Sequence, residues 1–238
     1  MQIRLDKFLA DAKVGTRSEV KEYIKKGRVS VNDEIAQKPE IKIDTEKNQI
    51  YFDSERVWEK GFVYYMLNKP KGVVSATTDN RDKTVVDLFQ QEKYSEELFP
   101  VGRLDKDTEG LLLLTNDGVL AHNLLSPKKH VEKVYYALIK GFVTEEDVSA
   151  FKEGLDIGEK KNTMPSDLHI LKSGEISEVQ VTICEGKFHQ VKRMFQAVSK
   201  EVIYLKRISM GKLTLDKRLQ PGEYRHLTEA EIELMKNR

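Results

Sequence analysis

The chain has one cysteine, no long apolar run and almost no net charge, and each shortage excludes a class of protein. The single cysteine, Cys184, cannot form an intramolecular disulfide, so we expect a reducing, cytoplasmic environment. No uncharged apolar run approaches the roughly 18 residues of a membrane span. The N-terminus, Met-Gln-Ile-Arg-Leu-Asp, lacks the apolar segment of a signal peptide. We therefore expect no attachment to a membrane.

Motifs for metals and nucleotide cofactors are also missing. No Cys/His spacing suggests a metal site, and no Gly-rich phosphate loop follows a strand pattern. We therefore expect neither a metal nor a cofactor. The length of 238 residues allows one large domain or two smaller ones with ample core, and we expect a monomer.

Positive charge is concentrated at the N-terminus. The whole chain has a net charge of +1, but residues 1–32 contain eight Lys or Arg and four Asp or Glu, so the rest sums to −3. Apolar spacing over residues 5–12 predicts an amphipathic helix. The capping-box pattern Thr16-Arg-Ser-Glu19 predicts the start of a second helix.

Basic side chains line one face of that second helix. Arg17, Lys21 and Lys25 are spaced four residues apart, which places them on the same side. Such a stripe is usually a solvated helix face. Its concentration in one small unit of a nearly neutral protein favours binding to phosphate groups instead. The candidate RNA-binding residues are Arg4, Arg17, Lys21, Lys25 and Arg28.

The stretch from Pro100 to Gly118 organises the rest of the chain. Leu111 to Leu114 form an uncharged apolar run closed by turn residues, which predicts a buried strand. The segment before this run contains three acids, Asp105, Asp107 and Glu109, together with Arg103. Acids are rarely placed against a core unless they are paired or used. Taken singly, each is more often a turn or cap residue.

This stretch resembles the central motif of the pseudouridine synthases, in the form of the RsuA branch. The matching residues are Gly102 to Asp105, Thr108, Gly110 to Thr115, Asp117 and Gly118. The resemblance implies that Asp105 is the catalytic residue and that Asp107 and Glu109 are not. It gives Arg103 a role in contacting phosphate or in ordering the segment.

Further motifs extend the resemblance over about residues 60–235. The family's first motif resembles Asn68-Lys-Pro-Lys-Gly72, which we interpret as a structural turn. The second motif assigns Tyr135 to stacking on the target base, and Tyr136 is expected in the core. The third motif assigns Lys192 to a contact with the catalytic carboxylate, where a cation favours the charged form. The Pro-Gly-Glu-Tyr-Arg ending at 221–225 is most similar to the RsuA branch.

The N-terminal unit resembles the αL RNA-binding domain named for a protein of the small ribosomal subunit. The match covers roughly residues 1–58. The usual Asn-Gly turn is replaced by Asn32-Asp33, and Asp tolerates left-handed geometry at some cost. Residues 54–61 have no clear period and are expected to form a linker. The domains are thus residues 1–58, for RNA binding, and 59–238, for catalysis.

The expected fold class is α+β, with a small αL RNA-binding domain and a mixed, mainly antiparallel sheet in the catalytic domain. The reaction implied by the resemblance converts a uridine of ribosomal RNA, most simply that of the small subunit, to pseudouridine without a cofactor. Asp105 would attack C1′ as a nucleophile or remove a sugar proton as a base. The partner would be ribosomal RNA or a ribosomal assembly particle.

Three alternatives remain open on sequence alone. The chain could modify large-subunit ribosomal RNA. It could be a non-catalytic RNA-binding protein of ribosome assembly, which the basic stripe fits equally well. It could be a glycoside hydrolase, which needs two facing carboxylates such as Asp105 with Asp107 or Glu109.

Overall fold

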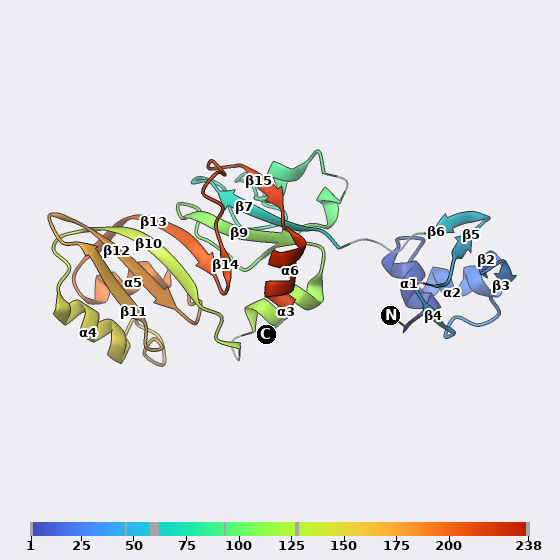
Figure 1. Ribbon diagram of the computed structural model, residues 1–238, viewed down its shortest axis with the longest axis horizontal. Coiled ribbons are helices and arrows are strands. Elements are labelled where there is room, and N and C mark those ends of the chain that lie inside the picture. The colour runs from blue at the N-terminus through green and yellow to red at the C-terminus, as the bar shows by residue number, and fades with distance from the viewer. Residues whose placement is uncertain (1, 46, 58–61, 93, 127–128, 237–238) are drawn as a thin grey trace. The chain divides into compact units, whose positions relative to one another are not determined.

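Two compact units make up the chain, Met1–Gly61 and Phe62–Arg238 (Figure 1). The computed structural model describes residues 2–45, 47–57, 62–92, 94–126 and 129–236. Within these ranges no helix is both long and apolar enough to cross a membrane. Helices and strands occur in both units, so the expected α+β class is confirmed.

Unit 1 packs two helices against short strands. A buried cluster that includes Leu5, Leu9, Ile24 and Ile50 joins them. The strand order in the larger sheet is β3-β2-β5-β6, and β1 pairs with β4. The elements are β1 (Gln2–Arg4), α1 (Leu5–Asp11), α2 (Arg17–Lys25), β2 (Val29–Val31), β3 (Glu34–Ile35), β4 (Lys42–Asp44), β5 (Ile50–Phe52) and β6 (Glu55–Val57).

Two local features of unit 1 were predicted from the sequence and are present. Helix α2 begins with the capping box: the Thr16 backbone N–H donates to Glu19 Oε2 at 2.8 Å, and the Glu19 N–H donates to Thr16 Oγ1 at 3.3 Å. The turn between β2 and β3 places Asn32 and Asp33 at φ 51° and 69°. The Asn-Asp pair therefore makes the left-handed turn in place of Asn-Gly.

The predicted linker at 54–61 is wrong in its first half. Residues Glu55–Val57 form strand β6, which pairs antiparallel with β5. A tight turn at Asp53 and Ser54, both with positive φ, reverses the chain between these strands. Short strands of this kind carry little sequence periodicity, because their stability comes from pairing with a neighbour. Residues 58–61 lie outside the described part of the chain.

Unit 2 is built on a mixed sheet with the strand order β11-β12-β10-β13-β9-β7-β15 in the described residues. Among the described strand pairs of this sheet only β9 with β13 is parallel. The strands are β7 (Tyr64–Lys69), β8 (Phe99–Val101), β9 (Glu109–Thr115), β10 (Lys133–Lys140), β11 (Asp167–Lys172), β12 (Ile176–Ile183), β13 (Glu201–Met210), β14 (Leu213–Thr214) and β15 (Tyr224–His226). The mixed, mainly antiparallel sheet is therefore confirmed.

Helices cover both faces of this sheet. In Figure 1, α4, at the lower left, and α5 lie against the β10–β13 half of the sheet, and α3 and α6 pack together at the β7–β9 half. The helices are η1 (Val86–Phe89), η2 (Ser95–Glu97), α3 (Gly118–Leu125), α4 (Glu145–Glu153), α5 (Gln190–Ala197) and α6 (Glu229–Lys236). Leu112 and Leu114 of β9 face the core that α4 and α5 cover, whereas Leu111 and Leu113 face α3 and α6. Burial on both faces explains why this strand is continuously apolar.

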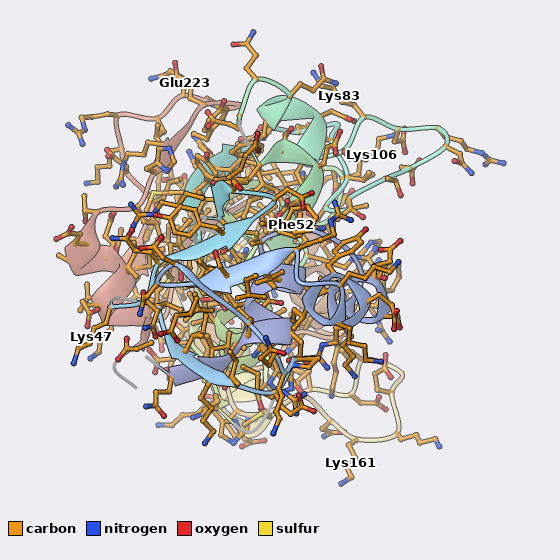
Figure 2. The ribbon with its side chains drawn as sticks, turned by 90° about the vertical axis from the view of Figure 1, so that its right-hand side faces the viewer. Lys47, Phe52, Lys83, Lys106, Lys161 and Glu223 are labelled. Atoms are coloured by element: carbon orange, nitrogen blue, oxygen red, sulfur yellow. The ribbon has the colours of Figure 1, made fainter. Side chains whose placement is uncertain are left out.

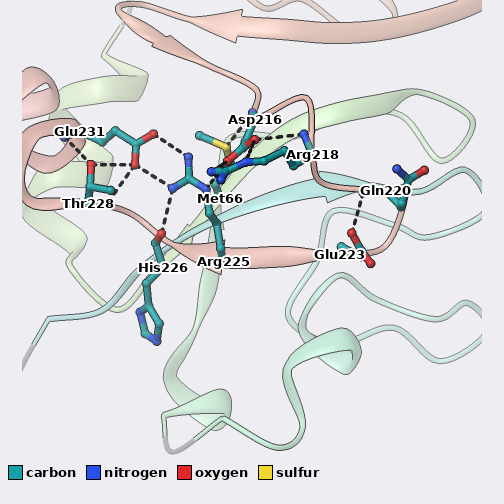
Figure 3. A network of polar contacts seen from close by, with 9 residues as sticks. All are labelled: Met66, Asp216, Arg218, Gln220, Glu223, Arg225, His226, Thr228 and Glu231. Carbon is teal, nitrogen blue, oxygen red and sulfur yellow. Dashed lines mark hydrogen bonds and ion pairs between the residues drawn. The ribbon is translucent and has the colours of Figure 1, made fainter.

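A polar network anchors the C-terminal elements to the sheet (Figure 3). Arg225 on β15 binds Asp216 at 2.8 Å and makes a two-pronged contact with Glu231 on α6, both at 2.8 Å. Hydrogen bonds from Arg218, then from its backbone and from Arg225, hold the pKa of Asp216 far below its usual value. Thr228 completes a capping box with Glu231 at the start of α6. These contacts attach α6 and the turn at Asp216 to β15, which is the edge strand of the sheet next to β7.

Candidate functional site

The loop between β8 and β9 carries Asp105 and is held by backbone contacts. Gly102 begins it with φ +82°, a conformation that favours glycine. The Ser75 hydroxyl donates to the Leu104 carbonyl at 2.9 Å and accepts from the Leu104 N–H at 3.0 Å. The Gly72 N–H donates to the Lys106 carbonyl at 2.7 Å. The turn at Lys69–Gly72 thus supports the loop, as its structural interpretation requires.

Lys69 is the strongest of these supports and was not predicted as a site residue. Its side chain is fully buried, and its ammonium group lies 2.9–3.4 Å from four backbone carbonyls, those of Pro70, Asp105, Lys106 and Thr108. Burial lowers the pKa of Lys69 to about 8, against the opposing pull of nearby carboxylates. The loop therefore surrounds the ammonium group of Lys69, which is the last residue of strand β7.

The Lys106 side chain ties the same loop to a neighbouring polar loop. Its ammonium group contacts Asp82 at 2.6 Å, next to Lys83 (Figure 2). Both lysine side chains lie at the surface of unit 2, so this contact is solvated and weak. Asp105 is therefore held mainly by the buried contacts of Lys69 and Ser75.

Gly110 allows β9 to approach β13 closely. Gly110 pairs with Arg207 in the parallel register, and a Cβ atom there would lie 2.2 Å from the Arg207 carbonyl oxygen. Arg207 is itself 2 % exposed, and its Nε donates to the Leu111 carbonyl at 2.7 Å. The close approach brings β13 beside the loop that ends in Glu109. The Glu109 carboxylate then accepts a 2.7 Å hydrogen bond from the Tyr204 hydroxyl.

Helix α5 brings Lys192 to the acids of the loop. The Lys192 ammonium lies 3.2 Å from Asp105 Oδ2 and 2.5 Å from Asp107 Oδ1. Burial lowers the pKa of Lys192, but hydrogen bonds and charge from both carboxylates outweigh it, so the net shift is upward. Burial raises the pKa of Asp107, and Lys192 more than reverses this, so that pKa lies below its usual value. Lys192 thus joins two acids, whereas the resemblance assigned it only to Asp105.

His189 approaches the other oxygen of Asp105. Its Nε2 lies 3.5 Å from Asp105 Oδ1, one helical turn before Lys192. The backbone of His189 is left-handed, at φ 49°, immediately before α5 begins. The two oxygens of Asp105 are therefore faced by an imidazole and an ammonium group. The side chain of Asp105 remains 26 % exposed, which leaves it accessible to a substrate.

The two tyrosines of β10 differ from expectation. Tyr135 is 7 % exposed and lies in one buried cluster with Leu104 and Val191, the sequence neighbours of Asp105 and Lys192. Tyr136 is only half-buried, and its hydroxyl donates to Glu178 at 2.9 Å, so the expectation that it is a core residue is wrong. Adjacent strand residues point to opposite faces, and here the face of Tyr135 is the covered one.

Arg103 lies on the exposed side of the loop. Within the described residues its guanidinium forms no ion pair or side-chain hydrogen bond, although its neighbour Leu104 is buried. An exposed guanidinium beside Asp105 can reach a phosphate or a base of a bound nucleic acid. The structure therefore brings Asp105 and Lys192 into contact, with Arg103 exposed on the same loop and Tyr135 buried in the cluster that contains Leu104 and Val191.

Of the predicted RNA-binding residues in unit 1, two are already paired. Arg4 makes a two-pronged contact with Asp6, at 3.0 and 2.7 Å. Arg28 pairs in the same way with Asp53, and its guanidinium lies 4.6 Å from the centre of the Phe52 ring. These pairs neutralise part of the positive charge that the sequence concentrates here. They also give the two arginines a structural role that spacing did not reveal.

The stripe on α2 keeps its charge at the surface. Arg17, Lys21 and Lys25 are all exposed on this helix. Lys25 has a loose contact with Glu22 at 3.4 Å, and in the described residues Arg17 and Lys21 form no ion pair. An exposed pair of this kind contributes little. Three cations on one helix face therefore remain available to phosphate groups.

The described side chains include no group of three or more His, Cys, Asp or Glu that could hold a metal ion. The acids near Asp105 are instead engaged by cations and hydroxyl donors. Asp105 and Asp107 share Lys192, and Glu109 accepts from Tyr204. Asp107 is also accessible, at 57 % exposure, but it and Asp105 contact the same Lys192 ammonium and do not face each other across an open gap, as a glycoside hydrolase would require.

Family models match both units of the chain. One described as RNA pseudouridylate synthase matches residues 63–197, and one described as S4 domain matches residues 3–48. The first match contains Asp105, Tyr135 and Lys192. The second contains the α2 stripe.

Curated proteins and a solved structure are similar over nearly the whole chain. An uncharacterized RNA pseudouridine synthase of Bacillus subtilis is 48 % identical over 98 % of each chain. A ribosomal small subunit pseudouridine synthase A of Haemophilus influenzae is 41 % identical, over 97 % of this chain and 98 % of its own. A crystal structure described as pseudouridylate synthase is 40 % identical with a TM-score of 0.70, over 98 % and 99 % of the two chains.

Proposed function

The chain belongs to the RNA pseudouridylate synthase family, and from this premise we propose that it converts one uridine of small-subunit ribosomal RNA to pseudouridine with Asp105 as the catalyst. The observation that carries the proposal is the accessible Asp105 carboxylate, one oxygen of which lies 3.2 Å from the Lys192 ammonium. The loop that carries Asp105 is held by the buried ammonium group of Lys69. The small-subunit target is supported by the names of relatives about 40 % identical over nearly their whole length.

The reaction is an isomerisation in which no atom is gained or lost. The bond between N1 of uracil and C1′ of ribose breaks, the base turns, and C5 bonds to C1′. The proton on C5 leaves, and N1 ends with a proton. Because electrons and atoms balance within the nucleoside, side chains alone can carry out the chemistry. The target base must be flipped out of its stack to reach the site.

Asp105 acts at the ribose of the flipped nucleotide. Lys192 and His189 orient its two oxygens, and Lys192 offsets its negative charge. Two routes are consistent with this geometry. The carboxylate either attacks C1′ as a nucleophile or removes the proton on C2′ as a base. Deuterium at C2′ of the target separates them: a primary isotope effect on single turnover supports the base, and its absence supports the nucleophile.

Tyr135 and Arg103 bind the substrate on either side of Asp105. Tyr135, only 7 % exposed, stacks its ring on the uracil, a contact that contributes about 1–3 kcal/mol per base. Arg103, on the exposed side of the loop, contacts a phosphate of the same strand. The aromatic ring thereby holds the base, and the contact of Arg103 with the RNA phosphate positions the strand that carries it.

The N-terminal unit holds the RNA through its phosphates. Residues 1–58 form the RNA-binding domain and residues 59–238 the catalytic domain. Arg17, Lys21 and Lys25 give the helix face that contacts phosphate, and Arg4 in β1 and Arg28 between α2 and β2 add to it. The protein acts as a monomer in the cytoplasm, on ribosomal RNA or on an assembling ribosomal particle.

Pseudouridine mapping in ribosomal RNA from cells with and without the gene tests the target. We expect one small-subunit site to be lost without the gene and restored by the wild-type protein. A lost site in large-subunit RNA would overturn the target, and no lost site in either RNA would overturn the ribosomal substrate.

The Asp105→Asn variant tests the catalyst, because it keeps the shape of the side chain and removes its charge. We expect no restoration of the site and at least a roughly thousandfold slower single turnover in vitro, with RNA binding retained. Asp107→Asn is the matched control, since it also touches Lys192, and most of its activity should remain. Appreciable turnover by Asp105→Asn would reassign the catalyst.

A further inference from the structure

Phe188 is a large apolar side chain that lies open to solvent beside the site. It is 72 % exposed, and one face of its ring stacks on the His189 imidazole, with centroids 3.8 Å apart and planes inclined by 18°. His189 in turn lies 3.5 Å from Asp105. A single imidazole therefore separates the exposed ring from the carboxylate that acts on the target.

Two hydrogen bonds hold the turn that presents Phe188. Gln190 Oε1 accepts from the Lys187 N–H at 2.9 Å, and Arg193 Nη1 donates to the Phe188 carbonyl at 3.1 Å. His189 keeps a left-handed backbone between them, at φ 49°. A ring on such a fixed turn loses little freedom when a partner stacks on it. The hydrogen bonds of the turn and the stacking on His189 thus fix the position of the exposed Phe188 ring.

The turn of Phe188 lies beside a loop that carries exposed lysines. The Lys187 ammonium donates to the carbonyls of Lys161 and Asn162, at 3.1 and 2.9 Å, so the 158–162 loop lies beside the turn. Lys160 and Lys161 are exposed on that loop, and Figure 2 shows Lys161 pointing outward at its tip. An apolar ring with exposed lysines on the neighbouring loop suits a nucleic acid strand, which offers both a π-face and a phosphate charge.

We propose that Phe188 is the stacking platform for the RNA base immediately next to the target uridine. This inference rests on the proposed function, because it takes Asp105 as the group at the target ribose. Flipping the target out of its stack leaves the adjacent base without one of its neighbours. Phe188 supplies the missing face, whereas Tyr135 is only 7 % exposed and is assigned to the target base itself. The class of ligand at this subsite is a nucleobase of single-stranded RNA.

Phe188→Leu and Phe188→Tyr test the platform with a small-subunit RNA fragment that spans the mapped target. Leucine keeps the apolar bulk and removes the π-face, whereas tyrosine keeps the ring. We expect Phe188→Leu to raise the KM about tenfold, and Phe188→Tyr to stay within about twofold of the wild type. Phe142→Leu is the matched control, since Phe142 is 61 % exposed in the turn before α4, and its KM should not change.

A fluorescent base locates the contact directly. 2-Aminopurine replaces the base on the 5′ or the 3′ side of the target, and Asp105→Asn is used as the background so that binding is read without turnover. We expect quenching at one of the two positions on binding, and its loss when Phe188→Leu is added. Thermal unfolding of each variant checks that the fold is intact.

The outcomes separate this inference from the proposed function. Unchanged KM and no quenching at either flanking base would overturn the platform while leaving Asp105 as the catalyst. A fall in kcat with unchanged KM and unchanged quenching would also overturn it, because the ring would then act only through His189. Turnover by Asp105→Asn would overturn the catalyst, and the fluorescence would still report whether Phe188 stacks on RNA.

Discussion

At the scale of single residues, the proposed catalytic carboxylate depends on neighbours from distant parts of the chain. Lys192 comes from α5 and is shared between Asp105 and Asp107, while Lys69 comes from β7 and holds the loop from below. Each of these side chains is charged and at least partly removed from water. Removing one of them exposes or unpairs the others, so the variants below are chosen to change one property at a time.

Substitutions of Tyr135 test whether its ring carries a function. Tyr135→Phe keeps the stacking face and loses the hydroxyl, whereas Tyr135→Ala removes the face. If the ring only stacks, single turnover should fall at least tenfold for Ala and by less than about threefold for Phe. A severe loss for Phe as well would mean that the hydroxyl helps to move the C5 proton. Near-wild-type rates for both would show that Tyr135 is only a core residue.

Lys69 predicts a dependence of stability on pH. Its pKa is 10.5 in an ordinary environment and about 8 when buried in the fold. Below pH 8 both states are protonated and the full cost of burying the charge is present. Between pH 8 and 10.5 the folded protein releases the proton and the unfolded chain keeps it, so folding becomes relatively more favourable as pH rises.

The difference in unfolding free energy between wild type and Lys69→Met should therefore grow in favour of wild type by roughly 2 kcal/mol from pH 7.5 to 10. Urea titrations at several pH values measure it. Lys71→Met, at an exposed neighbouring position, should give a difference that is flat with pH. A flat difference for Lys69→Met as well would mean that the buried ammonium keeps its proton through this range.

At the scale of elements, the site depends on the parallel pairing of β9 with β13, at Glu109 and Gly110 opposite Lys206 and Arg207. We call this pairing the β9–β13 joint. It brings Gly110 against Arg207 and lets the Tyr204 hydroxyl reach Glu109. Helix α5 packs on the same half of the sheet through Val191, Met194 and Phe195. A small backbone displacement at this joint would therefore move Lys192 relative to Asp105.

Gly110→Ala tests the joint. Gly110 has φ +103°, and a Cβ there would overlap the Arg207 carbonyl oxygen at 2.2 Å, so one of the two strands must shift. We expect a loss of at least about 3 kcal/mol in unfolding free energy, measured by urea denaturation, and a loss of activity. Gly118→Ala is the control, since nothing lies within 4 Å of its Cβ position and it begins α3. A mild effect of Gly110→Ala would show that the joint tolerates displacement.

At the scale of the whole molecule, positive charge and proposed chemistry belong to different units. The N-terminal helix α2 carries Arg17, Lys21 and Lys25, and the chain beyond residue 32 sums to −3. Long-range attraction for RNA must therefore come mainly from unit 1. Contacts to phosphate release counterions, so their number sets how steeply affinity falls with salt.

The triple variant Arg17→Ala/Lys21→Ala/Lys25→Ala should weaken binding to a small-subunit RNA fragment. The slope of log K against log salt should become shallower by roughly two to three units if all three residues contact phosphate. Turnover at saturating RNA should change little, because no residue of unit 2 is altered. The measurement is a binding series from low to moderate salt.

A second triple variant controls for net charge alone. Lys140→Ala/Lys152→Ala/Lys172→Ala removes the same charge from exposed positions of unit 2. Its slope should stay close to that of wild type. Equal slopes for both triple variants would mean that the α2 stripe is only a solvated face and that unit 2 holds the RNA.

Local chemistry in the sequence determined several features without help from the rest of the fold. The capping boxes at Thr16 and Thr228 start their helices because both partners lie within one turn. The apolar run Leu111–Leu114 is a buried strand because uncharged residues close together must find cover on both faces. The motif around Asp105 and the stripe on α2 were also readable, since each is contiguous or regularly spaced.

Only the tertiary structure decided which residues meet across long separations. Burial of Lys69 beneath the loop, the sharing of Lys192 by two acids and the approach of His189 join residues from different elements. The pairing of Arg4 with Asp6 and of Arg28 with Asp53 reduced the charge that composition assigned to RNA binding. Strands β6, β11 and β13 were not predicted, because short or irregularly patterned strands are defined mainly by pairing with neighbouring strands. Likewise, alternation places Tyr135 and Tyr136 on opposite faces of β10, but which face is covered depends on where the helices pack.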